Sequence, residues 1–94
     1  MNEFDRAIKK VYTTWQDGVG PHVGKALNYL MRAGLHRIGQ LCNSENYKEA
    51  LATVETMKNG FSVDKYKDKS FGDDASRVWG CLGNLESSLL SKSG

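Results

Sequence analysis

The sequence has little of several things that define specialised protein classes. It holds one proline and two cysteines in 94 residues, and no apolar run approaches the roughly 20 residues of a membrane-spanning helix. Cys42 and Cys81 have no C-x-x-C partner and no histidine at zinc-ligand spacing, which argues against a disulfide framework and against a metal site. We therefore expect two small, buried or half-buried thiols in a reducing compartment, no membrane association and no cofactor.

Charge of one sign is also scarce. The net charge is +2, too small for a general nucleic-acid binder, so DNA is not an expected partner. The excess is uneven, because residues 1–42 carry six basic against three acidic side chains, whereas residues 43–94 carry seven against eight. The first ten residues, MNEFDRAIKK, lack the basic start and apolar block of a signal peptide. The sequence thus predicts a cytosolic protein whose first half is the place for an anion.

What the sequence does contain is helical periodicity. With 39% hydrophobic and 26% charged residues, the composition is that of a folded, soluble protein of one domain, residues 1–94. Apolar residues recur at helical spacing in four stretches, about 3–16, 21–42, 45–58 and 73–89, with the last four residues fraying. Residues 60–73 show no sustained period and are expected to form a surface loop. The predicted fold class is all-α, a small antiparallel helical hairpin or bundle of about four helices.

The second of these helices should have two different faces. Pro21 fits its first turn, and its buried side is expected to consist of Val23, Ala26, Leu27, Leu30, Gly34, Ile38 and Leu41. Steps of three and four residues place a second group along a strip of roughly 21 Å: His22, Lys25, Tyr29, Arg32 and His36. Such a strip suits a nucleotide, because cations meet phosphates and a ring stacks on a base. The alternative is a solvated face with a half-buried tyrosine and two structural histidines.

The stretch DGVGPHVGK, before and at the start of this helix, does not match the phosphate loop of nucleotide hydrolases. That motif needs a glycine at position 19 and a hydroxyl at 26, where the chain has Val19 and Ala26. Free N–H groups at a helix start still attract anions, and Lys25 adds a charge beside them. Tyr12 lies one turn earlier, as a core residue or at the rim of such a pocket. Gly24, with two later glycines, is expected inside the helix, permitting a bend or a close approach.

Catalytic sets are not evident in the sequence. It has no suggestive Ser-His-Asp or Cys-His context, and a histidine acting as general base would lack an identifiable nucleophile. Arg77 lies near the start of the fourth helix, where a cation needs a negative partner. It either forms a salt bridge to Asp73 or Asp74 or contacts a second phosphate. A binding protein is therefore favoured over an enzyme.

At GPHVGKALNYLMRAGLHRIGQL the sequence resembles the helical hairpin of phage cyclic-oligonucleotide sponges, the family that defeats the bacterial CBASS defence. A related hairpin occurs in sponges that defeat Thoeris signalling. The resemblance is best over residues 8–42 and weaker over 73–90. It implies a protein of the host bacterial cytoplasm that assembles as a homohexamer. It also implies capture, without cleavage, of cyclic dinucleotides such as cyclic GMP-AMP between protomers and of cyclic trinucleotides at separate sites.

The resemblance also implies roles for individual residues. Tyr12 falls on the position that meets a dinucleotide base, and Lys25 on the position that meets its phosphate. The trinucleotide site corresponds to Gly24 and to Ala75 and Arg77. The four other residues of the strip, His22, Tyr29, Arg32 and His36, come from helical spacing alone and could face another subunit. Two further classes remain: a small helical inhibitor or adaptor that binds a host protein, and a nuclease or phosphodiesterase.

Overall fold

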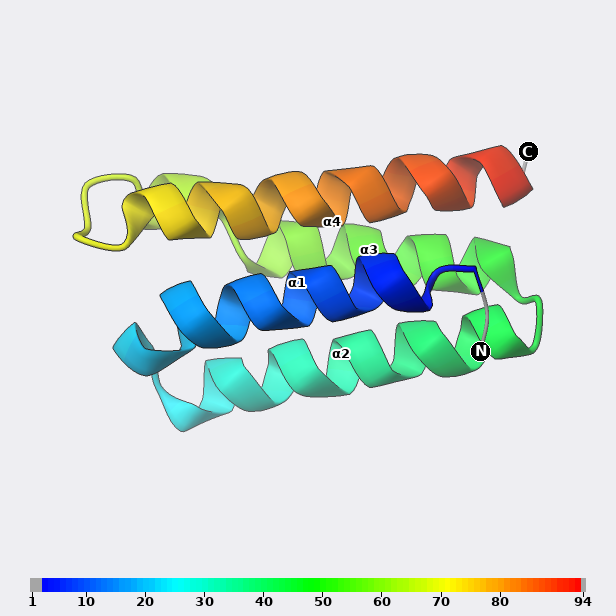
Figure 1. The fold of residues 1–94 in the computed structure, drawn as a ribbon, viewed down its shortest axis with the longest axis horizontal. Coiled ribbons are helices and arrows are strands. Elements are labelled where there is room, and N and C mark those ends of the chain that lie inside the picture. The colour runs from blue at the N-terminus through cyan, green and yellow to red at the C-terminus, as the bar shows by residue number, and fades with distance from the viewer. Residues whose placement is uncertain (1–2, 94) are drawn as a thin grey trace.

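The structure, a computed structural model, describes residues 3–93. It contains four α-helices: α1 (Asp5–Gly18), α2 (Lys25–Asn43), α3 (Tyr47–Gly60) and α4 (Gly72–Ser93). Two short 3-10 turns lie between them, η1 (Gly20–His22) and η2 (Val63–Lys65), and no strand occurs within residues 3–93. Successive helices run in opposite directions along the length of a bundle that measures 37 × 21 × 19 Å (Figure 1). The all-α prediction with four helices is confirmed.

The core lies where the four helices face one another. α4 contributes one completely buried residue on almost every turn, namely Ala75, Val78, Leu82, Leu85 and Leu89. α1 contributes Val11 and Trp15, and the Trp15 ring meets Phe61 edge-on at 4.9 Å between centroids. Burying a valine or leucine side chain stabilises the fold by about 1.5–3 kcal/mol. The regular spacing of buried residues along α4 therefore largely accounts for the position of this helix in the bundle.

The start of α2 differs from the prediction. Pro21 belongs to η1, and Val23 and Gly24 are extended, with ψ of 167° and 170°, so the helix begins only at Lys25. Gly24 is thus the residue before the helix, and its expected place in the helix interior was wrong. An extended residue cannot continue a helical hydrogen-bond ladder, so the two residues separate the proline turn from α2.

The buried face of α2 also differs from the prediction. The buried residues are Met31, Leu35, Ile38 and Cys42. Leu30, expected in the core, is 63% exposed, and Ala26 is exposed as well. Apolar side chains cover more than one side of this helix, so the pattern fits several rotations about its axis, and contacts with α1 and α3 select one.

The segment after α3 is better packed than a surface loop. Phe61 and Phe71 are buried, and Tyr66 bridges them with ring centroids 5.2 Å from Phe61 and 5.6 Å from Phe71. The expectation of a surface loop therefore fails for its aromatic residues. Phe61 packs on Trp15 and Phe71 packs on His22, and such contacts with distant parts of the chain leave no local period in the sequence.

Both cysteines lie where the sequence analysis placed them. Cys42 is buried and Cys81 is partly buried, and neither forms a disulfide. Burial raises the pKa of the Cys42 thiol, and the carboxylates of Asp5 and Glu3 raise it further.

The fraying expected for the last four residues does not occur at residues 91–93, which continue α4. Among the described residues, no helix combines the length and the apolar character needed to cross a membrane.

Candidate functional site

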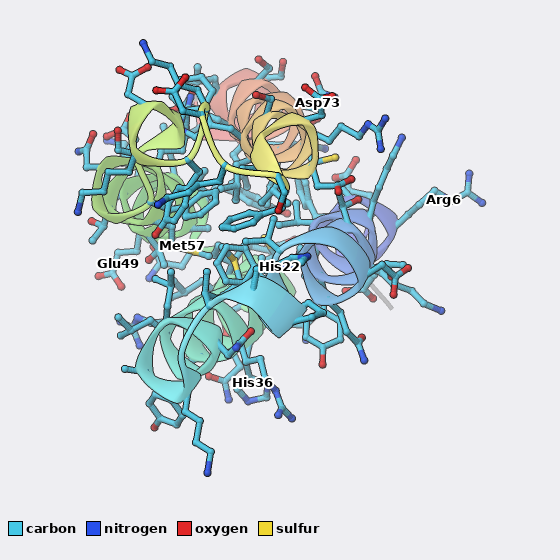
Figure 2. The ribbon with its side chains drawn as sticks, turned by 90° about the vertical axis from the view of Figure 1, so that its left-hand side faces the viewer. Arg6, His22, His36, Glu49, Met57 and Asp73 are labelled. Carbon is cyan, nitrogen blue, oxygen red and sulfur yellow. The ribbon has the colours of Figure 1, made fainter. Side chains whose placement is uncertain are left out.

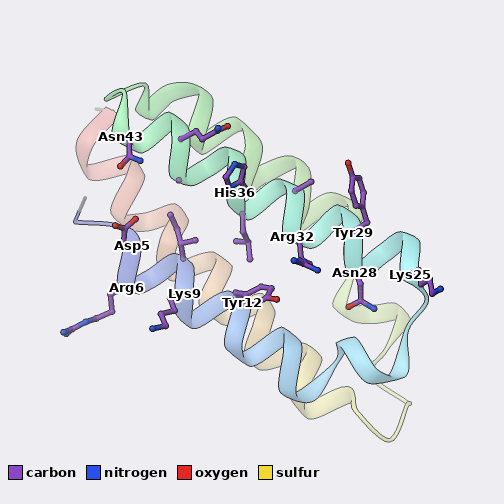
Figure 3. A pocket seen from close by; sticks show the side chains of 15 residues that line it. Asp5, Arg6, Lys9, Tyr12, Lys25, Asn28, Tyr29, Arg32, His36 and Asn43 are labelled. Atoms are coloured by element: carbon purple, nitrogen blue, oxygen red, sulfur yellow. The ribbon is translucent and has the colours of Figure 1, made fainter. Parts of the chain in front are cut away.

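A long open groove runs between α1 and α2 (Figure 3). Its volume is about 1490 Å³. Its polar and aromatic lining includes Asp5, Arg6, Lys9 and Tyr12 from α1 and Lys25, Asn28, Tyr29, Arg32, His36, Gln40 and Asn43 from α2. Five of the residues singled out in the sequence, namely Tyr12, Lys25, Tyr29, Arg32 and His36, thus line one groove.

The groove is basic. Four cationic side chains line it (Arg6, Lys9, Lys25 and Arg32), against the single carboxylate of Asp5. None of the ion pairs found within residues 3–93 involves any of these four cations. No carboxylate of the described part of the chain is paired with these charges, so an anionic ligand can bind without first displacing such a partner.

Tyr12 and Arg32 project from opposite walls into the middle of the groove (Figure 3). Tyr12 is partly buried, which fixes its ring more firmly than a free surface side chain. His36 follows Arg32 by one helical turn and lines the same wall. A flat ring on one wall and a planar guanidinium and an imidazole on the other therefore line the same groove, and each can stack on a base or meet a phosphate.

Lys25 and Tyr29 lie nearer the rim. Lys25 is the first residue of α2, and its side chain points away from Tyr12 (Figure 3). Tyr29 is 72% exposed and points away from α1. Within one chain, the cation that faces Tyr12 is consequently Arg32, while Lys25 can serve a phosphate at the end of the groove.

Two residues of the predicted strip and site stand apart from the groove. His22 stacks on Phe71 with ring centroids 4.7 Å apart and planes 3° apart, at the end of the bundle that faces the viewer in Figure 2. His36, which does line the groove, is well separated from His22 in the same view. Gly24 precedes α2 and does not line the groove. The helical strip inferred from the sequence is broken at its start because residues 20–24 are not part of α2.

The two α4 residues of the predicted trinucleotide site also lie elsewhere. Ala75 is completely buried, so its methyl group is a core contact. The Arg77 guanidinium binds the Asp74 carboxylate at 3.1 Å, which confirms the salt bridge considered as one alternative. The Arg77 side chain is 70% exposed, and such a pair contributes little to stability. Arg77 is therefore free to exchange Asp74 for another anion.

The sequence analysis missed several residues of the groove, Arg6, Lys9 and Asn28 among them. Lys9 precedes Tyr12 by three positions, a spacing that makes the two side chains neighbours on α1, whereas Arg6, six positions before Tyr12, is not placed beside it by helical spacing. Asn28 was also missed. It accepts a hydrogen bond from the Trp15 indole nitrogen at 2.7 Å, a contact between helices that no local pattern reveals.

Replacing Gly24 by alanine separates a ligand role from a folding role. Its φ of −76° suits any residue, and an added Cβ meets no atom within 4 Å. We expect Gly24→Ala to leave the free energy of unfolding within about 0.5 kcal/mol of the wild type. If a phosphate approaches this backbone closely, calorimetric titration should show about tenfold weaker binding of a cyclic trinucleotide, since each 1.4 kcal/mol of steric cost is tenfold. Unchanged affinity would exclude Gly24 from that site.

No known family model, curated protein or solved structure matches the chain. Within residues 3–93, no three His, Cys, Asp or Glu side chains gather as a metal site.

Proposed function

We propose that this protein binds cyclic oligonucleotide second messengers in the α1–α2 groove and sequesters them without cleaving them. The observation that carries the proposal is the combination, in one groove, of four cations that form no ion pair within residues 3–93 and the aromatic side chains of Tyr12 and His36. In keeping with the resemblance of residues 8–42, the setting we propose is the cytoplasm of a phage-infected bacterium. Loss of free messenger would keep CBASS effectors inactive by mass action.

Cyclic dinucleotides such as cyclic GMP-AMP match this chemistry. Each carries two phosphate charges and two bases in a compact ring. Arginine binds phosphate through two parallel hydrogen bonds, which suits Arg32, and base–aromatic stacking contributes about 1–3 kcal/mol per base, which suits Tyr12. Lys25, at one end of the groove, and Lys9, on the other side of Tyr12, each offer charge for a second phosphate.

The openness of the groove supports an oligomer as part of the proposal. A tightly held small ligand normally has most of its surface buried, whereas an open groove on one protomer leaves one side of the ligand in water. A neighbouring copy covering the groove would complete the site. The resemblance implies a homohexamer, and the mass of the particle in solution, measured by light scattering, tests this number.

A separate trinucleotide site is the less developed part of the proposal. It rests on the resemblance at Gly24, Ala75 and Arg77. None of the three lines the α1–α2 groove, which is compatible with a second location. Arg77 is the residue there with a charge to offer, after exchange of Asp74.

Isothermal titration of the purified protein with cyclic GMP-AMP, and separately with a cyclic trinucleotide, tests the proposal. We expect saturable binding without any protein partner, and chemically intact nucleotide when the ligand is recovered and chromatographed. Absence of binding to both ligands would overturn the proposal. Recovery of cleaved ligand would replace sequestration by a nuclease or phosphodiesterase activity.

One observation favours a second candidate, a small adaptor or inhibitor that binds a host protein. An apolar groove of about 380 Å³ lies between α2 and α3, lined by Leu27, Met31, Met57 and the exposed Leu30. An apolar side chain of another protein could fill it. The two candidates differ in a simple way, because the adaptor has no need of nucleotide and Leu30→Glu should abolish its partner binding while sparing nucleotide binding.

A further inference from the structure

We infer that Asn28 is the positioning residue of the α1–α2 groove: it fixes the start of α2, and Lys25 with it, against the core of the protein. This inference rests on the proposed nucleotide-binding function of the groove. It concerns a residue that lines the groove but whose side-chain amide is occupied by the protein itself.

The Asn28 amide joins Trp15 to the segment from Gly20 to Gly24, where its Nδ2 also lies 3.5 Å from the Val23 carbonyl oxygen. Its Oδ1 accepts a hydrogen bond from Trp15 Nε1 at 2.7 Å. Its Nδ2 donates to the carbonyl oxygens of Gly20 and Gly24, each at 3.1 Å. An amide nitrogen has two hydrogens to donate, so both are used and neither is left for a ligand.

These contacts tie the start of α2 to the core of the bundle. Trp15 is 1% exposed and is held in the core by its contact with Phe61. The start of α2, by contrast, has no side-chain cap at Gly24 and no acidic residue in its first turn. The Asn28 amide supports this end in another way than a cap does, because it donates to the Gly20 and Gly24 carbonyl oxygens and so holds the chain that leads into α2.

Gly20 supplies an independent observation. An added Cβ at Gly20 would lie 2.9 Å from Asn28 Oδ1 and 3.4 Å from Trp15 Nε1. The first distance is closer than a carbon–oxygen contact allows, so a side chain here would push the two hydrogen-bonded groups apart. The glycine thus permits the Trp15–Asn28 hydrogen bond, in contrast to Gly24, where a Cβ has free space.

The consequence for the groove follows from the position of Asn28 in α2. Lys25 precedes it by three residues, so the same turn that Asn28 holds presents the Lys25 ammonium. If the turn frays, Lys25 loses its fixed position and its contribution to binding falls. A charged group that is already held in place before the ligand arrives increases the affinity, because binding then costs less conformational entropy.

The test is a double-mutant cycle measured by titration with cyclic GMP-AMP. We expect Asn28→Ala to bind about tenfold more weakly, equivalent to 1.4 kcal/mol. We also expect Lys25→Ala to cost less in the Asn28→Ala background than in the wild type, because contacting or coupled residues are non-additive. Asn84→Ala, an exposed asparagine on α4, is the matched control and should change neither value. A residue that only stabilises the fold would lower stability without this coupling to Lys25.

Nuclear magnetic resonance gives a second readout of the same contact. The two indole N–H signals belong to Trp15 and Trp79, and Trp79→Phe assigns them. Asn28→Ala should shift the Trp15 signal and leave that of Trp79 in place. If Asn28→Ala is unfolded at the measuring temperature, Gly20→Ala replaces it, since it retains the amide and crowds the bond.

The outcomes separate the two proposals. Two results would overturn the positioning role and leave the function standing. One is that Asn28→Ala binds the nucleotide with the same affinity as the wild type. The other is that Asn28→Ala binds more weakly, but Lys25→Ala costs as much in that background as in the wild type. No nucleotide binding by the wild type would overturn both. Weaker binding together with reduced Lys25 dependence supports Asn28 as the positioning residue.

Discussion

Arg32→Ala and Tyr12→Ala should each weaken the binding of cyclic GMP-AMP by about tenfold to a hundredfold. A hydrogen bond to a charged group contributes about 1.5–3 kcal/mol, and stacking of a base on an aromatic ring about 1–3 kcal/mol. Both side chains project into the middle of the groove, where a ligand cannot avoid them (Figure 3). Isothermal titration at low ionic strength measures the change.

Two matched variants make this result specific. Arg37 lies on α2 as well, but it lines the apolar groove and pairs with Glu49 at 3.6 Å. Arg37→Ala should change the affinity by less than about twofold, because a remote charge acts only through a screened field. Tyr12→Phe keeps the ring and should retain most of the binding. If Arg37→Ala is as damaging as Arg32→Ala, the ligand responds to overall charge and the groove assignment fails.

Gly72→Ala should produce the largest loss of stability of any glycine substitution considered. A Cβ at Gly72 would lie 2.7 Å from the carbonyl oxygen of Lys67 and 2.8 Å from that of Tyr66. These are backbone atoms, which cannot swing aside as the end of a side chain can. Overpacking typically costs about 1–3 kcal/mol, and we expect at least the upper part of that range here. Urea denaturation measures the free energy of unfolding.

Gly80→Ala is the control for the glycine experiment. Gly80 is an exposed residue inside α4, and a Cβ there meets nothing within 4 Å. Alanine should therefore stabilise the protein by about 1 kcal/mol, through its higher helix propensity. Opposite signs at the two positions are the expected result. A loss at Gly72 no larger than about 0.5 kcal/mol would mean that the turn before α4 moves to make room.

Sequence reasoning placed Tyr12 with Lys25, at the glycine segment, whereas the structure places Arg32 opposite Tyr12 and turns Lys25 away from it. Tyr12 lies six positions before the end of α1, and Arg32 seven positions after the start of α2. Antiparallel helices joined by a short turn bring residues at equal distances from the turn to the same height. The four helices themselves were predicted from the spacing of their apolar residues, because that signal is contained within each segment.

Other features depend on contacts between distant residues and leave no local sign in the sequence. Leu30 and Met31 are neighbours of similar hydrophobicity, and only packing against α1 and α3 decides which of them is buried. The burial of Phe61 and Phe71 depends on rings elsewhere in the fold. The Trp15–Asn28 hydrogen bond spans 13 positions and a turn whose shape was not predictable from its composition.

The position of α2 has a thermodynamic consequence. The helix is a wall shared by the basic groove on one side and the apolar groove on the other, and Ala33 lines both. A ligand in either groove that favours one position of α2 changes the affinity of the opposite groove for its own ligand. Reciprocity requires the factor to be the same in both directions. The dissociation constant measured for a nucleotide will then depend on whatever fills the apolar groove, including the concentration of the protein itself if its copies associate there.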